Sequence, residues 1–220
     1  YGHQPSASTQ CMPAASAVAK IIGRASLSVR IPSLALGTHP SALPEQTLRE
    51  GFDFACQGEG PYTITDLLHE LSQPQPHFYS LIPGLKWLMQ DSNLCPVSRH
   101  MENVVNLDKE LPDQAWELLD MKKYRPHHWH SWTGDPKGGY ASIQTSLGCP
   151  YGCLFCCINT IFGQRSYYRM WSPVTIASQI RTLVDVHGIT NLKIADEMFV
   201  LNRQHVWKIC DHIIDMGLGD

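Results

Sequence analysis

The feature that most constrains this chain is a dense run of cysteines. Four of its eight cysteines fall within "GCPYGCLFCC" at positions 148–157. Ordinary core packing does not concentrate thiols in this way, and secreted proteins spread their cysteines at the spacings of a disulfide framework. The run instead favours metal or redox chemistry in a reducing compartment, held by a single loop.

Three of these residues, Cys149, Cys153 and Cys156, have the spacing C-x3-C-x2-C. Three thiolates from one short loop can bind three corners of a cubane 4Fe-4S cluster and leave the fourth iron open to an outside ligand. A structural zinc site is the alternative, but zinc normally takes four closed ligands from paired C-x2-C units. Cys157 directly follows Cys156, and neighbouring residues seldom turn both side chains to one metal. We therefore predict a cluster site beside which Cys157 is a buried, small apolar residue.

The first 72 residues alternate between strand and helix patterns. "SLALG" at 33–37 predicts a buried strand, "ALPEQTLREG" at 42–51 a short helix, and "DFACQ" at 53–57 a second strand. A longer helix follows "GEGP", because Pro61 suits a first helical turn. Two such repeats are typical of a parallel, doubly wound α/β sheet, whose ligands bind at the carboxyl ends of the strands. An earlier helix is expected to bury a face formed by Ala14, Ala15, Val18, Ile21 and Ile22.

From Tyr140 the strand and helix rhythm returns. "YASIQTS" at 140–146 predicts a strand that leads into the cysteine loop, and "NLKIA" at 191–195 predicts another that ends at Asp196 and Glu197. Between them Ser172 and Pro173 predict a helix start, with serine as the cap. The helices are expected to bury Val174, Ala177, Ile180 and Val184, and Val206, Ile209, Cys210 and Ile213. This β-α-β-α opening stops before a barrel could close, so we expect a fragment.

Residues 73–139 differ in composition, because they mix proline and other turn formers with Trp116, Trp129 and Trp132. We predict an ordered connecting segment, since disordered segments are poor in aromatic residues. "HHWH", with His127, His128 and His130, is expected to lie in this linker rather than to bind metal. The predicted domains are therefore 1–72, 73–139 and 140–220.

Charge and hydropathy limit the partners of the chain. With 220 residues, 43% of them apolar, and a net charge of −3, the chain suits one or two domains. The near balance of charge excludes an electrostatic case for nucleic acid or a membrane surface. No apolar run approaches the roughly 18–20 residues that span a bilayer. We therefore predict a cytoplasmic protein with no nucleic-acid partner and no membrane association.

The cysteine motif, with Phe155 before its last cysteine, resembles the cluster motif of radical S-adenosylmethionine (SAM) enzymes. "YASIQTSLGCPYGCLFCCI", "YYRMWSP" and "NLKIADEMFVLN" resemble the cobalamin (B12)-binding branch of that family. The resemblance implies cluster ligands at Cys149, Cys153 and Cys156, and places Phe155 against the adenine of SAM.

The same resemblance implies further SAM contacts. Asp196 and Glu197 stand where the family has a Gly-Gly-Glu-like segment that binds the methionyl ammonium, and a carboxylate suits that cation. The alternative for Asp196 is that it caps the next turn. Arg169 resembles an arginine that could bind the SAM carboxylate or brace the loop.

"LGTHPSALPEQTLREGFDFACQGEG" at 36–60 resembles the second half of a Rossmann-like cobalamin-binding domain. The resemblance implies that two glycine loops line the cobalamin, formed by Gly37, Thr38, His39 and Pro40, and by Gly58, Glu59 and Gly60. "GHQPSAS" looks like a loop in which Ser6 and Ser8 flank the nucleotide tail. Leu36 departs from the glycine that relatives carry, and the segment that supplies a histidine to cobalt would precede Tyr1, so His39 is expected to be a loop contact. The alternative is a Rossmann-like half without a ligand.

The resemblance implies an enzyme that cleaves SAM to a 5′-deoxyadenosyl radical at a 4Fe-4S cluster and methylates an unactivated carbon through methylcobalamin. It also implies a small-molecule or natural-product substrate and an electron donor such as flavodoxin or ferredoxin. One alternative is a tetrapyrrole-type oxidative cyclase. A methylthiotransferase would need three more cluster cysteines, and Cys11, Cys56 and Cys95 do not have suitable spacings. A metal-stabilised binding module without catalysis is the alternative from another class.

Overall fold

The computed structural model describes residues 5–24, 31–89, 91, 93–95, 102–124, 139–162 and 168–218, with side chains from Cys11 onward. The chain divides into two compact units. The first contains residues 1–104 and 150–166, and the second contains residues 105–149 and 167–220. These boundaries differ from those expected at 72 and 139, and the predicted domain assignment stays a prediction.

The first unit is built on a small sheet in the order β1-β2-β3. Strands β1 (Leu34–Ala35) and β2 (Phe54–Cys56) are parallel, as predicted. Strand β3 (Leu85–Lys86) adds antiparallel to β2, although it lies in the segment that we expected to connect domains. The core of this unit consists of Phe54, Leu67, Ile82 and Leu85, with Leu34, Leu71, Tyr79 and Trp87 packed against it.

Five helices and a 3-10 turn are described in the first unit: α1 (Pro5–Arg24), α2 (Thr38–Ala42), α3 (Pro44–Arg49), α4 (Gly60–Ser72), α6 (Asn159–Phe162) and η1 (Tyr79–Leu81). The single helix expected at 42–51 is two helices, with Leu43 between them at φ −130° and ψ 59°. The break follows from Pro44, because a residue that precedes proline is pushed away from helical dihedrals.

The predicted buried face of α1 is wrong in part. Met12, Ser16 and Ala19 are buried, whereas Val18 and Ile21 are 55% and 68% exposed. On the buried face Ser16 donates a hydrogen bond of 3.1 Å to Glu50, which follows α3.

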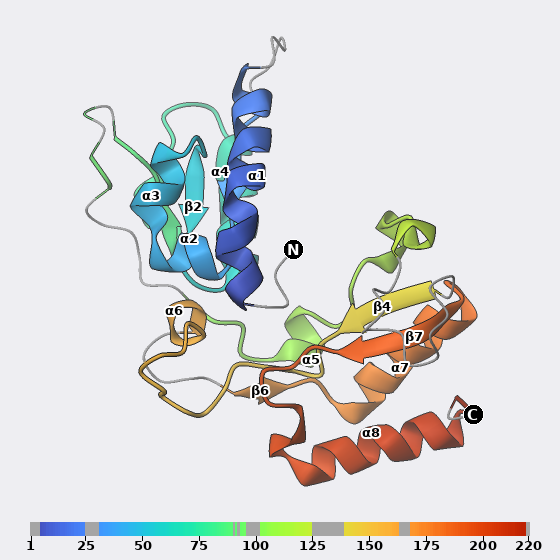
Figure 1. Ribbon diagram of the computed structural model, residues 1–220. Helices are drawn as coiled ribbons and strands as arrows, with labels where there is room; N and C mark the ends of the chain where they lie inside the picture. Colours follow the sequence, from blue (N-terminus) through green and yellow to red (C-terminus); the bar gives the residue numbers. More distant parts are fainter. Residues whose placement is uncertain are drawn as a thin grey trace. The chain divides into compact units, whose positions relative to one another are not determined.

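The second unit contains two pairs of strands. Strands β4 (Gly139–Ile143) and β7 (Ile189–Ile194) are parallel, and β5 (Ser146–Leu147) pairs antiparallel with β6 (Arg169–Met170). Helices α7 (Pro173–Asp185) and α8 (Arg203–Asp215) pack on each other beside the β4 and β7 pair (Figure 1). Short helices complete the unit: α5 (Leu107–Glu110), η2 (Trp116–Leu118), η3 (Met121–Lys123) and η4 (Phe199–Leu201).

The start of α7 is as predicted, since the Ser172 side chain accepts a hydrogen bond from the Thr175 N–H and Pro173 occupies the first turn. Two predicted core positions are wrong. Val174 is 63% exposed, and Cys210 on α8 is exposed. In α7 the buried face is centred one residue further on, at Ile176, Ala177, Ile180 and Leu183.

The chain therefore has a mixed α/β fold, as the strand and helix rhythm predicts. Trp116 is buried in the second unit. Trp129, Trp132 and the histidines of "HHWH" lie outside the described residues, so their predicted place in a linker stays a prediction. Within the part of the chain that the structure describes, no helix is long and apolar enough to cross a membrane.

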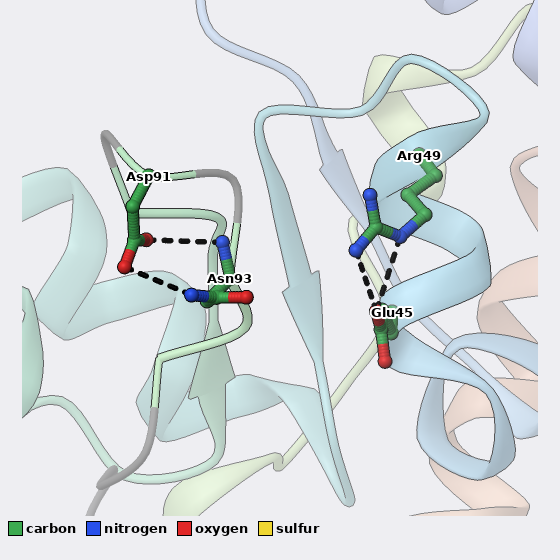
Figure 2. A network of polar contacts seen from close by, with 4 residues as sticks. All are labelled: Glu45, Arg49, Asp91 and Asn93. Carbon is green, nitrogen blue, oxygen red and sulfur yellow. Dashed lines mark hydrogen bonds and ion pairs between the residues drawn. The ribbon is translucent and has the colours of Figure 1, made fainter.

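The surface of the first unit carries two exposed polar pairs, each between residues that are close in the sequence. Figure 2 shows Arg49 paired with Glu45 one turn earlier on α3, at 2.7 Å, and the Asp91 carboxylate accepting from Asn93. These residues are exposed, so solvent screens the pairs and they contribute little to stability.

Candidate functional site

The carboxyl ends of β4 and β7 lie side by side in the second unit. Ile143 is in register with Ile194, and the Ala195 N–H donates to the Ile143 carbonyl at 2.8 Å. The next residues of the two strands are therefore neighbours, although about 50 positions separate them in the sequence. The strand that leads to Cys149 thus ends beside the predicted SAM-binding pair, Asp196 and Glu197.

Asp196 is bonded on both carboxylate oxygens. Its Oδ1 accepts from the Thr145 N–H at 2.6 Å. Its Oδ2 accepts from the Thr145 hydroxyl at 2.6 Å and from the Ser146 hydroxyl at 2.7 Å. Thr145 and Ser146 are both fully buried. The carboxylate therefore braces the end of β4, and its predicted contact with SAM stays a prediction.

Glu197 is more accessible than its neighbour and has a different set of partners. Partial desolvation raises the pKa of this carboxyl and the charge of Asp196 adds to the rise, although the residue as a whole is exposed. The Gly148 backbone N–H and the charge of Arg169 act in the opposite direction. Glu197 therefore lies close to the residue that precedes Cys149, in an accessible place where a cation could bind.

Arg169 is buried in β6, where it pairs with Leu147 of β5. Its charge acts on Glu197. The structure thus brings Arg169, Glu197 and Asp196 together in the second unit, next to the chain that leads to Cys149. This position agrees with bracing of the loop, and a contact with the SAM carboxylate stays a prediction.

All eight cysteines are free thiols. Cys149 belongs to the second unit and is half-buried, whereas Cys153 and Cys156 belong to the first and are exposed and half-buried. Phe155 is 93% exposed. Among the described residues, no group of three or more His, Cys, Asp or Glu side chains is placed to hold a metal ion. The donor set fits a cluster by its chemistry, since the three thiols are free, and the ligand assignment stays a prediction.

Cys157 departs from the prediction, because it is half-buried rather than buried. The burial that remains raises the pKa of this thiol, and the neighbouring Cys156 adds to the rise. Its environment therefore favours the neutral thiol over the thiolate that a metal would need.

The two predicted cobalamin loops lie together in the first unit. Gly37 follows β1 and Gly58 follows β2, and both have the positive φ that favours glycine, 113° and 108°. The Ser41 hydroxyl joins them, because it donates to the Gly37 carbonyl at 2.6 Å and accepts from the Gly58 N–H at 3.0 Å. The carboxyl ends of two parallel strands thus present a pair of glycine turns, which suits close approach of a flat ligand.

The remaining loop residues have distinct places. Thr38 is half-buried at the start of α2, and Pro40 is buried. Gly60 begins α4, where an added Cβ would lie 3.0 Å from the Leu36 side chain. Glu59 is buried, and its Oε2 accepts from the Val104 N–H at 2.8 Å, so this carboxylate holds a neighbouring segment of the same unit.

His39 is buried and lines a cavity of about 530 Å³ between α1 and the α2–α3 region. Ser6 and Ser8 lie in the first turns of α1, so the expectation that they belong to a loop is wrong. Pro5 explains this start, since proline is favoured in a first helical turn. Their side chains lie outside the described part of the structure, and their contact with a nucleotide tail stays a prediction.

Sequence reasoning missed several residues that organise these sites. Ser41 joins the two glycine loops, Thr145 and Ser146 bind Asp196, and His205 contacts the Thr145 hydroxyl. Asp108 caps α7 from a distant segment. Only Ser41 had a usable signal, since it directly follows the loop of glycine, histidine and proline.

Several known proteins are similar in sequence, although no family model matches the chain. The chain is 28% identical over 214 residues to an uncharacterized methyltransferase of Pyrococcus horikoshii, covering 96% of this chain and 43% of the relative. It is 27% identical over 165 residues to the anaerobic magnesium-protoporphyrin IX monomethyl ester cyclase of Synechocystis, covering 74% and 29%. The hopanoid C-3 methylase of Methylococcus capsulatus is 32% identical over 113 residues, covering 51% and 19%.

Two solved structures share the fold. TsrM, a radical SAM methyltransferase from Kitasatospora setae with cobalamin and a 4Fe-4S cluster bound, matches 96% of this chain with a TM-score of 0.64 at 20% identity. The cobalamin-dependent SAM radical enzyme OxsB matches 94% of this chain, also with a TM-score of 0.64 at 20% identity. The chain resembles the cobalamin-binding radical SAM enzymes. It spans 38% of TsrM and 27% of OxsB, and less than half of each relative above.

Proposed function

We propose that this protein is a cobalamin-dependent radical SAM methyltransferase. The observation that carries the proposal is the C-x3-C-x2-C loop, which follows the carboxyl end of β4 in a fold shared with TsrM and OxsB. We infer that the first unit is the C-terminal part of a Rossmann-like cobalamin-binding domain. The second unit is then the opening of a partial TIM-type barrel.

The residues of this chain supply binding and orientation. Cys149, Cys153 and Cys156 offer three free thiols for a 4Fe-4S cluster. Glu197 offers an accessible carboxylate for the ammonium of SAM, a charge-assisted contact that holds the cosubstrate in place. Gly37 and Gly58 offer turns without a Cβ, against which a corrin can lie closely.

A 4Fe-4S cluster held by Cys149, Cys153 and Cys156 would supply reductive cleavage of SAM, and a cobalamin held at the Gly37 and Gly58 loops would supply methyl-transfer chemistry. The substrate in this proposal is a small molecule or natural product, and the reducing partner is a protein such as flavodoxin or ferredoxin. Oxidative ring closure is the second candidate function, because one relative that covers 74% of this chain is a magnesium-protoporphyrin cyclase.

The first test is anaerobic reconstitution of the full chain with iron, sulfide and hydroxocobalamin, followed by desalting and an ultraviolet–visible spectrum. Both iron–sulfur and corrin absorbance are expected to stay with the protein. Substitution of Cys149, Cys153 or Cys156 by alanine is expected to remove the iron–sulfur band, whereas Cys157→Ala retains it. Stoichiometric zinc in place of iron and sulfide would show instead that the loop is a structural metal site.

A second test separates methyl transfer from ring closure. The reconstituted protein is incubated with SAM that carries a deuterated methyl group, a reductant and candidate substrates. A methyltransferase moves the label to a product as 5′-deoxyadenosine forms. If 5′-deoxyadenosine accumulates and no product contains deuterium, the methyltransferase proposal fails and the cyclase candidate stands.

A further inference from the structure

Both oxygens of the Asp196 carboxylate accept hydrogen bonds from within the protein. Three donors from two consecutive residues, Thr145 and Ser146, bind its two oxygens at 2.6, 2.6 and 2.7 Å. Both donor residues are fully buried. Short hydrogen bonds to a charged acceptor are about twice as strong as neutral ones. The Asp196 carboxylate therefore binds the residues that follow β4.

Thr145 connects this carboxylate to the rest of the second unit. Its carbonyl accepts from the Trp171 N–H at 3.1 Å, directly after β6. Its hydroxyl lies 3.3 Å from Nε2 of His205, which is buried in α8. Thr145, two residues after β4, thus contacts Trp171 after β6, Asp196 after β7 and His205 of α8.

The network lies directly before a predicted cluster ligand. Ser146 begins β5, and only Leu147 and Gly148 separate it from Cys149. The Gly148 backbone N–H lies near enough to Glu197 to lower the pKa of its carboxyl. The bonds of Asp196 therefore fix the chain on the amino-terminal side of Cys149, and Glu197 lies near the residue that precedes this cysteine.

We propose that Asp196 is a positioning residue, which holds Thr145 and Ser146 so that Cys149 and Glu197 are presented in fixed places. Glu197 is then the carboxylate that binds the ammonium of SAM. This inference rests on the proposed function. The sequence assigns SAM binding to both adjacent acids, whereas here only Glu197 binds SAM and Asp196 positions the loop.

The test compares the substitutions Asp196→Asn, Thr145→Val and Ser146→Ala with Glu197→Gln in the full chain. Amide hydrogen exchange of peptides covering 145–149 is measured without cofactors. Iron content and the dissociation constant of SAM are measured after reconstitution. Asp196→Asn and Thr145→Val are each expected to speed exchange roughly tenfold or more, because each removes bonds to a charged acceptor. Both are expected to lower iron content as well.

Double substitution provides the sharper readout. Asp196→Asn combined with Thr145→Val is expected to be no worse than the stronger single variant, since both remove one shared interaction. Thr145→Ser keeps the hydroxyl and is expected to exchange within about twofold of the unsubstituted protein. Glu197→Gln is expected to weaken SAM binding roughly tenfold while iron content is retained. Asp211→Asn, an exposed acid on α8, is the matched control and should change neither quantity.

Two results would overturn the positioning role. One is weaker SAM binding in Asp196→Asn with normal exchange at 145–149 and normal iron content, because this would make Asp196 a direct contact. The other is normal exchange in Thr145→Val. If the unsubstituted protein holds neither iron nor SAM, the proposed function fails, and the exchange rates still decide whether Asp196 positions the loop.

Discussion

At the scale of single residues, His205 shows how the second unit controls protonation. Burial lowers the pKa of this imidazole from its ordinary value of 6.5, and the charge of Asp196 and a hydrogen bond with the Thr145 backbone offset only part of the effect. The folded protein therefore favours neutral His205. A neutral ring can stay beside the Thr145 hydroxyl without bringing an unpaired buried charge.

The lowered pKa predicts a pH dependence of stability. Between the folded and the ordinary pKa, the unfolded chain binds more protons than the folded one, so the free energy of unfolding falls as pH falls. The contribution is complete above about pH 6.5 and is lost as pH falls through the folded pKa. Urea unfolding of the apo protein at about pH 7.5 and pH 5.0 is expected to show a smaller loss in His205→Gln than in the unsubstituted chain. Equal losses in the two proteins would contradict this assignment.

At the scale of elements, helix α7 is capped by a segment far away in the sequence. Asp108 of α5 accepts from the Ser172 N–H at 2.9 and 3.0 Å and from the Thr175 hydroxyl at 2.6 Å. Burial opposes ionisation of this carboxyl, but the hydrogen bonds from Thr175 and Ser172 outweigh it and lower its pKa. An ionised acid at a helix amino terminus also interacts favourably with the helix dipole.

Removal of this cap is expected to destabilise the second unit. Asp108→Ala should lower the free energy of unfolding by about 1–2 kcal/mol, the usual cost of a lost helix cap. The control is Glu117→Ala, an exposed acid in η2 of the same unit, which should change it by less than about 0.5 kcal/mol. Urea unfolding of both variants measures the difference. Equal stability of the two would mean that Asp108 does not support α7.

Two glycines of the first unit predict opposite effects of alanine. Gly84 precedes β3 at φ 69°, and a Cβ there would lie 2.5 Å from the Gln57 carbonyl oxygen. Gly84→Ala is expected to lose at least about 1–2 kcal/mol from the dihedral alone. Gly23 lies in α1 with no atom within 4 Å of an added Cβ, so Gly23→Ala should be neutral or stabilising by up to about 1 kcal/mol. Thermal unfolding compares them, and equal shifts would contradict the close approach at Gly84.

The elements also show how far the sequence predicts the fold. Local patterns located β1, β2, β4 and β7, because each is a short apolar run that ends at a turn or a polar pair. They did not locate β3, since its antiparallel pairing with β2 depends on the turn at Gly84 and has no local signal. The motifs placed Asp196 and Glu197 correctly at a strand end. They could not show that Thr145 donates hydrogen bonds to Asp196, because 51 positions separate the two residues in the sequence.

At the scale of the whole molecule, the predicted cobalamin contacts and the predicted cluster ligands lie on different loops. Gly37, Ser41 and Gly58 follow strands of the first unit, whereas Cys149 and Glu197 belong to the second unit and Cys153 and Cys156 to the first. The Ser41 hydroxyl forms its bonds to Gly37 and Gly58 entirely within the first unit. A substitution at Ser41 should therefore weaken cobalamin binding, and a substitution at Cys149 should weaken cluster binding.

The separate loops predict that the two cofactors can be lost separately. Ser41→Ala removes both bonds that join the glycine loops and is expected to weaken cobalamin binding roughly tenfold while iron content is retained. Cys149→Ala is expected to lose the iron and to keep the corrin. Ser80→Ala, an exposed serine in η1, is the control for Ser41 and should keep both. Iron analysis and corrin absorbance after desalting measure the two cofactors in one sample. Because the hydroxyl of Ser41 bonds Gly37, Cys56 and Gly58, all within the first unit, parallel loss of corrin and iron in Ser41→Ala would show that the cofactor sites do not load independently.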